Sequence, residues 1–490
     1  MSQILMFVAL SFFSLLSSPS LAAEFQATGN ATSPSDVCRF APDPSYCRSV
    51  LPNQPGDIYT YGRSSLRQSI SRARRFMSLI DDQLNRKGKV AAKSTVRALE
   101  DCKFLASQTM DFLLSSSQTV DATKTLSVST AEDVQTFLSA TITNEQTCLE
   151  GLTSTASENG LSGDLFNDTK LYGVSLALFS KGWVPIRKRS RPVWNRQASF
   201  KKFFGGFRNG RLPIKMSERA RAVYNTVTRS GRKLLQTEEG AVKVSDMVTV
   251  IQNGTGNFTT INEAVAAAPN KTDGSNGYFL IYVTAGLYEE YVEIPKYKSF
   301  EAYQDTLYTH SLRQFYRECD VYGTVDFIFG NAAVVLQNCN LYPRQPRKGQ
   351  ANEVTAQGRT DPNQNTGTVL HGCTIRPADD LASSNYTVKT YLGRPWKEYS
   401  RTIVMQTYID GFLDPTGWNA WSGDFALSTL YYAEYNNTGP GSNTTNRVGW
   451  PGYHVITNAS DASNFTVTNF LVGEGWIGQT GVPFVGGLIA

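Results

Sequence analysis

The stretch Ala333-Val-Val-Leu-Gln-Asn-Cys-Asn-Leu341 decides the fold class of the second half of the chain, because its pattern returns further along. Asn338–Asn340 and His371–Ile375 look like equivalent positions on successive coils. A repeat of about 20–45 residues is typical of a solenoid. Shorter β-rich runs, such as Met247–Ile251 and Tyr278–Val283, are separated by turn residues. We therefore predict a right-handed parallel β-helix over 241–490, with a Greek-key sandwich as the alternative that the pattern leaves open.

The region 24–180 has a different periodicity, which is that of helices. Apolar residues fall near one face at helical spacing, and further amphipathic runs surround Val96–Leu114 and Val134–Leu152. The apolar positions of the first run are Leu66, Ile70, Phe76, Ile80 and Leu84. This pattern predicts an all-α bundle, and the chain as a whole is predicted to hold an all-α and an all-β part.

Four of the seven cysteines, Cys38, Cys47, Cys102 and Cys148, lie in this helical region. Four cysteines allow three connectivities, so the sequence alone does not fix the pairing. We predict Cys38–Cys47, between near neighbours, and Cys102–Cys148, between two later helices.

The first 22 residues have the pattern of a secretory signal peptide. An apolar run from Ile4 to Leu16 ends in small residues, with Ser20 and Ala22 placed as a cleavage site. Later stretches are too short or too polar to cross a membrane. The chain also carries many N-x-S/T sequons, which are typical of a secreted glycoprotein; they begin at Asn167, Asn253, Asn257, Asn270, Asn385, Asn443 and Asn464.

The net charge of +5 arises in a basic linker, 181–240. Beyond Gln236 acidic residues outnumber basic ones, so the charge does not indicate a nucleic-acid-binding domain. The linker contains Arg232-Lys233-Leu234-Leu235. Dibasic sites in exposed linkers suit processing proteases. We predict cleavage after Leu235, which would release Gln236 as a new N-terminus.

Four strings in the second half resemble the plant pectin methylesterase family. They are Gly286–Glu290, Gln304–Leu307, Asp326–Gly330 and Leu392–Trp396. The helical region resembles the pectin methylesterase inhibitor family, an extracellular four-helix bundle with a preceding helical hairpin. The tetrapeptide at 232–235 resembles the site that separates the two parts in plant precursors. The resemblance covers nearly the whole chain.

The residues themselves favour carboxylate chemistry. Ester hydrolysis needs a nucleophile, a proton donor for the leaving methoxide and stabilisation of the oxyanion. The histidines show no serine-triad context, and the serines of the C-terminal half lack a nucleophile elbow. Asp305 and Asp326 are 21 residues apart, about one coil, which would stack them on one face. Adjacent carboxylates separate each other's pKa values, so that one stays protonated beside its charged neighbour.

The resemblance assigns roles to these residues. It implies that Asp326 is the nucleophile, that Asp305 donates and then accepts a proton, and that Arg394 pairs with Asp326 and binds substrate. Gln304 would stabilise the oxyanion. A substrate cleft is implied at Trp396, Tyr308 and Phe329. No metal and no organic cofactor is implied.

The family pattern is interrupted between Lys298 and Ser299. Relatives of this kind carry about three more coils at this point, with a second oxyanion glutamine and one or more cysteines. Oxyanion stabilisation therefore falls to Gln304 and nearby backbone amides. Among the remaining cysteines we predict a bridge between Cys339 and Cys373, which leaves Cys319 as a free thiol.

Three functions follow as hypotheses. The first is hydrolysis of the methyl esters of homogalacturonan to pectate and methanol in the plant cell wall, with the helical region contacting its own catalytic half before processing. The second is a regulatory protein that acts through its inhibitor-like bundle or binds pectin, because the shortened β-helix is a poor catalyst. Pectin-cleaving lyases and glycosidases share the fold, but the strings around Asp326 and Arg394 favour the esterase.

Overall fold

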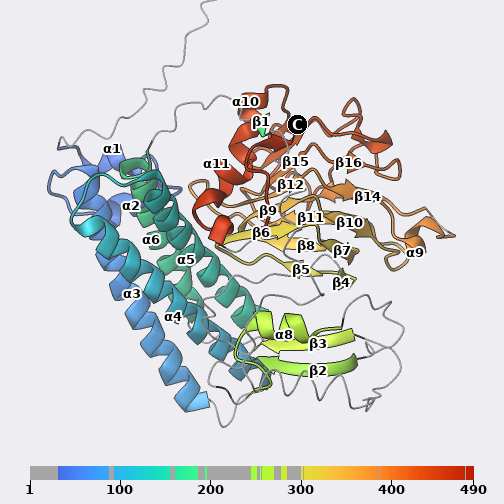
Figure 1. The fold of residues 1–490 in the computed structure, drawn as a ribbon. Coiled ribbons are helices and arrows are strands. Elements are labelled where there is room, and N and C mark those ends of the chain that lie inside the picture. Colours follow the sequence, from blue (N-terminus) through green and yellow to red (C-terminus); the bar gives the residue numbers. More distant parts are fainter. Residues whose placement is uncertain are drawn as a thin grey trace, which may run out of the picture.

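The computed structural model joins an N-terminal helical bundle to a C-terminal stack of parallel sheets (Figure 1). It describes residues 31–87, 93–154, 161–185, 194–195, 244–250, 254, 256–269, 278–283, 299–301, 303–385, 387–479 and 482–489. The predicted signal peptide and processing site lie outside these residues. No described helix combines the length and apolar character that a membrane span requires.

Four long helices and a short hairpin form the bundle. In chain order the helices are α1 (Pro34–Cys38), α2 (Pro44–Val50), α3 (Ile58–Lys87), α4 (Lys93–Asp121), α5 (Val128–Ser154) and α6 (Leu161–Gly182). Helix α1 begins at a capping box, in which the Ser33 and Asp36 side chains satisfy each other's backbone amides. Disulfides Cys38–Cys47 and Cys102–Cys148 close the hairpin and join α4 to α5, and both confirm the predicted pairing.

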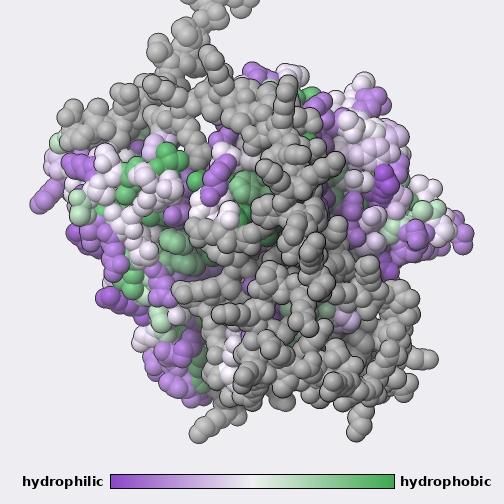
Figure 2. Space-filling view, viewed as in Figure 1, coloured by the Kyte–Doolittle hydropathy of each residue, from purple (hydrophilic) through white to green (hydrophobic). Residues whose placement is uncertain are grey.

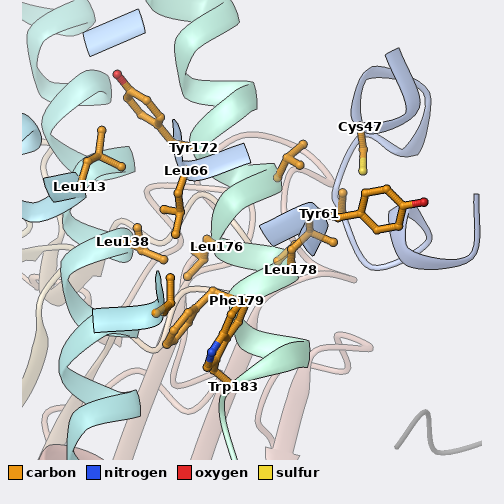
Figure 3. Close-up of a cluster of buried hydrophobic side chains, with 14 of the residues drawn as sticks. Cys47, Tyr61, Leu66, Leu113, Leu138, Tyr172, Leu176, Leu178, Phe179 and Trp183 are labelled. Carbon is orange, nitrogen blue, oxygen red and sulfur yellow. The ribbon is translucent and has the colours of Figure 1, made fainter. Parts of the chain in front are cut away.

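The bundle core is apolar and fully enclosed. Figure 3 shows Leu66 of α3 and Leu138 of α5 directed toward Leu176 and Phe179 of α6. Each of these side chains is at most 1 % exposed. Burial of such side chains supplies most of the stability of a helical bundle, because isolated helices are marginal in water. The described bundle surface in Figure 2 is mainly hydrophilic, with small hydrophobic patches.

Three parallel sheets form the body of the second part. The first sheet contains β4 (Ser299–Glu301), β7 (Asp320–Gly323), β10 (Asn340–Pro343), β13 (Thr374–Ile375) and β16 (Tyr408–Ile409). The second contains β5 (Leu307–Tyr308), β8 (Ile328–Gly330), β11 (Asn352–Gln357) and β14 (Thr390–Gly393). The third contains β6 (Arg313–Arg317), β9 (Ala333–Gln337), β12 (Gly367–His371), β15 (Arg401–Met405), β17 (Tyr431–Tyr435) and β18 (Tyr453–Val455).

The strand register confirms the coil repeat. Leu336 on β9 pairs with Leu370 on β12, and Asn340 on β10 pairs with Thr374 on β13. The chain visits each sheet in turn and returns to pair in parallel with the previous coil, which is the topology of a β-helix and not of a Greek-key sandwich. Two short helices, α10 (Ala459–Ala462) and α11 (Val467–Leu471), pack against the third sheet, while α9 (Asp379–Ala382) projects at the opposite edge (Figure 1).

The predicted bridge between Cys339 and Cys373 is wrong. Both thiols are free and buried, as is that of Cys319. The Cys373 thiol instead donates to the carbonyl oxygen of Leu336, at 3.2 Å between Sγ and O. Within a β-helix, cysteines of successive coils lie in the core, where their thiols pack as small apolar groups.

The thiol content tests this correction. Unfolded in denaturant without reductant, the protein is expected to react with three equivalents of a thiol reagent, and the folded protein with none, because burial protects all three groups. Cys319→Ser should reduce the count to two. A count of one in the unfolded wild-type protein would indicate that Cys339 and Cys373 are disulfide-bonded after all.

A separate small unit precedes the main sheets. Strands β2 (Val244–Val250) and β3 (Tyr278–Val283) pair only with each other, and α8 (Ile261–Ala267) packs beside them. Among the described residues no strand pairing joins β2 or β3 to the main sheets, whose first strands are β4, β5 and β6. Among the residues that the structure describes, the strands before and after the Lys298–Ser299 junction therefore share no backbone ladder.

Part of the predicted linker has regular structure. β1 (Trp194–Asn195) pairs in parallel with β19 (Leu488–Ile489) near the end of the chain. This short pairing lies on the C-terminal side of the β-helix (Figure 1).

Candidate active site

The second sheet places the two aspartates on adjacent coils. Leu307 and Tyr308 of β5 pair with Ile328 and Phe329 of β8, an offset of one coil. Asp305 and Asp326 therefore occupy equivalent positions just before the two strands. The Asp305 amide donates to the carbonyl oxygen of Val325 at 3.1 Å, which fixes this alignment beyond the strand ends.

Both aspartates have left-handed backbone conformations. The φ angle is 56° at Asp305 and 50° at Asp326. This region is costly for most residues with a Cβ and is tolerated best by Asn and Asp. Strained backbone held by its surroundings is common at functional sites. Because both aspartates have this conformation, the chain turns in the same direction just before β5 and just before β8.

Arg394 binds Asp326 through two parallel hydrogen bonds. Its Nε and Nη2 atoms each donate to a different carboxylate oxygen at 2.8 Å. Asp326 is 5 % exposed, whereas the Arg394 side chain keeps 23 % of its surface exposed. The Arg394 amide donates to the carbonyl oxygen of Thr355 on β11, the strand that lies between β8 and β14. A bidentate pair of this kind fixes the orientation of both side chains.

The two aspartates differ in electrostatic environment. Burial and the charge of Asp326 raise the pKa of Asp305, although a hydrogen bond from Gln304 and the charge of Arg394 act in the opposite direction. Burial alone would lower the pKa of Arg394, but the hydrogen bonds and charge of Asp326 raise it. Asp305, which lies beside the ion pair of Asp326 and Arg394, therefore keeps its proton to higher pH than an ordinary aspartate.

Aromatic rings line the surface next to this pair. Tyr308 and Phe329 stack in parallel with ring centroids 4.4 Å apart, and Trp396 meets the edge of Phe329 at 5.9 Å. The Tyr308 side chain is among the exposed large hydrophobic groups, at 41 %. A flat, partly exposed aromatic surface suits the apolar face of a sugar ring.

The sequence-predicted residues thus come from distant segments to one place. The structure brings Gln304, Asp305, Asp326 and Arg394 into one interacting group, and Tyr308, Phe329 and Trp396 into another. Their catalytic and binding roles stay predictions. Among the described residues, no group of three or more His, Cys, Asp or Glu side chains is arranged to hold a metal ion.

Sequence reasoning missed Trp421. Its ring lies 4.4 Å from Cζ of Arg394, and its side chain is 38 % exposed. It therefore covers the guanidinium on a face that Asp326 does not use. Trp421 lies in a loop outside the quoted strings, and no spacing rule links it to Arg394. Only the folded coil shows the contact.

Helix α5 of the bundle lies against this aromatic surface. Thr147 Oγ1 is 2.9 Å from His310 Nε2 and 3.4 Å from the Tyr308 hydroxyl. Glu150 forms an ion pair with Lys397, the residue after Trp396. A narrow pocket remains between the two parts, lined by Thr147 and Glu150 on one side and by Tyr308 and Trp396 on the other.

Further contacts along α5 involve the loop that follows β11. Asn365 Nδ2 donates to Thr136 Oγ1 at 3.0 Å, and Gln364 Nε2 donates to the carbonyl oxygen of Ser139 at the same distance. Asn331 Nδ2 donates to Thr143 Oγ1, also at 3.0 Å. The face of α5 that meets the β-helix is thus rich in threonine and serine, which supply hydrogen-bonding groups in place of an apolar stripe.

Fold and site together define a β-helical protein whose buried aspartate is paired with an arginine beside a second aspartate, an arrangement suited to a carboxylic ester hydrolase. Comparison with known families gives the particular class. The model of the family described as Pectinesterase matches residues 247–300 and 297–474, and that of Plant invertase/pectin methylesterase inhibitor matches 32–178. The chain belongs to the pectinesterase family and carries an inhibitor-type domain at its N-terminal end.

Full-length relatives support the assignment. "Probable pectinesterase/pectinesterase inhibitor 20" of Arabidopsis thaliana is 75 % identical, and "Probable pectinesterase/pectinesterase inhibitor 7" of the same plant is 52 % identical, each with 100 % of both chains covered. A solved structure, "Pectin methylesterase from Carrot", is 39 % identical over 52 % of this chain and 100 % of that chain, with a TM-score of 0.39.

The comparisons also bear on the interrupted pattern. The alignment with the first relative extends over 564 positions, whereas this chain has 490 residues. The two pieces of the pectinesterase match meet at 297–300. Both observations agree with a segment missing at the Lys298–Ser299 junction.

Gln304→Leu is expected to change both the rate and its pH dependence. If Gln304 stabilises the oxyanion, its loss should lower kcat by about 100-fold or more. The hydrogen bond from Gln304 also lowers the pKa of Asp305, so its loss raises that pKa. If Asp305 acts as the acid, the alkaline limb of kcat/KM moves to higher pH. Steady-state methanol release between pH 4 and 10 measures both effects. An unchanged alkaline limb would show that Gln304 does not influence the titration of Asp305.

Proposed function

We propose that this chain hydrolyses the methyl esters of homogalacturonan to pectate and methanol, with Asp326 as the nucleophile and Asp305 as the acid and base. The bidentate pair between Arg394 and Asp326, with Asp305 one coil away, carries the proposal. The pair holds a charged carboxylate in a fixed orientation. Asp305, whose pKa is raised, supplies the proton that a methoxide leaving group requires.

The reaction has two steps. An Asp326 oxygen attacks the ester carbonyl carbon, and the bond to the methoxyl oxygen breaks as Asp305 gives that oxygen its proton. Methanol leaves, and the galacturonate is joined to Asp326 as an anhydride. Asp305, now charged, takes a proton from a water molecule that attacks the anhydride. This second step frees the Asp326 carboxylate, a protonated Asp305 and a galacturonic acid group, which loses the second proton of the water to solvent and becomes the pectate carboxylate.

Gln304 and the aromatic surface would serve the same reaction. Gln304 stands next to Asp305 in sequence and donates to its carboxylate, which places an amide N–H donor at the reacting centre. Tyr308, Phe329 and Trp396 form a surface on which sugar rings can stack, and Arg394 lies at its edge. Pectin would therefore bind along the second sheet.

In the precursor, the helical bundle is proposed to shield this surface. Thr147 of α5 contacts Tyr308, one of the proposed sugar-binding rings, and the neighbouring His310. Glu150 pairs with Lys397, the residue after Trp396. Polymer and α5 would compete for the same side chains. Proteolysis after Leu235 would release the bundle, and secretion to the plant cell wall would bring the enzyme to its substrate. Exposed sequon residues such as Asn167 and Asn464 suit glycosylation on that route.

A second function is favoured by the break in the family pattern between Lys298 and Ser299, across which no described strand pairing connects β3 with β4. A β-helix that has lost coils loses part of the cleft and one oxyanion donor, and the chain would then act mainly through its inhibitor-like bundle. Inhibition of an intact pectin methylesterase by residues 24–180, together with no activity in the processed chain, would favour this function.

Methanol release decides between the two. The full chain is cut in the linker and incubated with highly methyl-esterified homogalacturonan, with an Asp326→Ala chain treated identically. The enzyme proposal expects methanol from the wild-type chain at a rate far above the Asp326→Ala control. Equal rates in the wild-type and Asp326→Ala chains would contradict the enzyme proposal and favour the regulatory function.

A further inference from the structure

We propose that Glu353 and Asn419 are positioning residues for the ion pair between Arg394 and Asp326. Neither belongs to the strings that define the site. The inference rests on the proposed function, because it concerns how that site is held together. Its geometry comes from three hydrogen bonds that connect both partners of the ion pair to one buried glutamate.

The first connection leads to Arg394. Glu353 lies on β11, is 2 % exposed, and accepts a hydrogen bond at Oε1 from Asn419 Nδ2 at 2.9 Å. The backbone N–H of Asn419 donates to the carbonyl oxygen of Gly393 at 3.0 Å, and Gly393 immediately precedes Arg394. The Glu353 carboxylate therefore holds Asn419, and Asn419 holds the end of β14 from which the arginine side chain extends.

The second connection leads to Asp326. The amide of Phe327 donates to the carbonyl oxygen of Glu353 at 3.2 Å, and Phe327 follows Asp326 directly. Glu353 is thus linked to the segment of Arg394 through its side chain and Asn419, and to the segment of Asp326 through its own backbone carbonyl. A shift of this residue would move the two partners relative to each other.

The loop that Asn419 anchors also carries Trp421, whose ring covers the Arg394 guanidinium at 4.4 Å. Freeing Asn419 would loosen this cover as well as the Gly393 contact. Glu353 is also part of the charge balance of the site. Burial and, to a smaller extent, the charge of Asp326 raise the pKa of Glu353. The charge of Arg394 and the hydrogen bond from Asn419 oppose that rise.

The choice of residue types supports a positioning role. A buried carboxylate without partners is costly, so Glu353 is kept only where its hydrogen bond and a nearby cation compensate for its burial. An ionised carboxylate only accepts hydrogen bonds, so it fixes which end of the Asn419 amide faces it. Apolar residues would fill the same space without defining the orientation of Asn419.

Four variants of the full chain, assayed after linker cleavage, test the pair. Glu353→Ala and Asn419→Ala are each expected to lower kcat by about tenfold, with KM changed less than about twofold, because a displaced catalytic group costs rate more than binding. Glu353→Gln keeps an acceptor oxygen for Asn419 and should retain kcat within about twofold. In Glu353→Ala/Asn419→Ala the loss should match that of one single variant. Thermal unfolding of each variant reports its folded fraction.

A spectroscopic measurement makes the test independent of turnover. With ¹⁵N-labelled arginine, the Nε–H signal of Arg394, assigned by its loss in Arg394→Lys, should be sharp and slow to exchange in the wild type and in Glu353→Gln. It should exchange faster in Glu353→Ala and Asn419→Ala. Unchanged exchange in both alanine variants would overturn the inference. Loss of activity in every variant with unchanged exchange would also overturn it. A wild-type chain as inactive as Asp326→Ala would instead contradict the proposed function, and the exchange rates would still decide the role of Glu353.

Discussion

Asp326→Asn is expected to remove nearly all methanol release from the processed chain. An amide has the shape of the carboxylate but is a far weaker nucleophile, so the covalent step is lost. Replacing single members of a serine protease's catalytic triad lowers kcat by factors on the order of 10⁴–10⁶, and a loss of at least about 1000-fold is expected here. Arg394 also loses its charged partner, because both its hydrogen bonds end on this carboxylate.

Asp320→Asn is the matched control. Asp320 lies on β7, the strand before Asp326, and accepts a hydrogen bond from Asn340 Nδ2 at 2.7 Å. It contacts neither Arg394 nor the aromatic surface in any described interaction. Its variant should keep methanol release within about threefold of the wild type, as a substitution away from special features does. Equal losses in the two variants would mean that the coil, and not the nucleophile, had been damaged.

Release of the bundle is the second change with a large expected effect. Before cleavage, the linker keeps α5 at an effective concentration on the order of millimolar beside the cleft. Cutting it and diluting the two parts should raise methanol release by about tenfold or more. The rate is measured on the uncut chain, on the freshly cut chain and on the cut chain after separation of its parts.

A point variant in α5 should reproduce part of this activation without any cut. Glu150→Ala removes the ion pair with Lys397 and should raise the activity of the uncut chain. Asp121→Ala is its control, since Asp121 pairs only weakly with Arg67 at the end of α4 and both side chains are largely exposed. Equal activity of uncut and cut wild-type chains would show that the bundle does not shield the site.

Much of the fold could be predicted from the sequence because both parts repeat. In the bundle, residues such as Leu66 and Phe76 are spaced as on one face of a helix, and this local geometry is kept in the fold. In the β-helix, the recurrence at Asn338–Asn340 and His371–Ile375 reports the length of one coil. The 21-residue spacing of Asp305 and Asp326 could be predicted to align them for the same reason, since the coil length sets the register.

Other features could not be predicted, since they depend on distances across the folded coils. Cys339 and Cys373 lie in neighbouring coils, as predicted, but their thiols remain free and donate to backbone carbonyl oxygens in the core. Trp421 reaches Arg394 from a loop whose path no motif describes. The contact of Thr147 with His310 joins segments more than 150 residues apart, and no helical pattern distinguishes the face of α5 that makes it.

The central claim is that Asp326 forms the covalent intermediate, and trapping that intermediate tests it most directly. The processed chain is allowed to turn over methyl-esterified homogalacturonan in the presence of hydroxylamine, which attacks an aspartyl anhydride and leaves a hydroxamate on the protein. Peptide mass spectrometry should locate that hydroxamate on Asp326, and Arg394→Lys should carry less of it. Continued methanol release with Asp326 unmodified, or a hydroxamate on Asp305 in its place, would contradict the account.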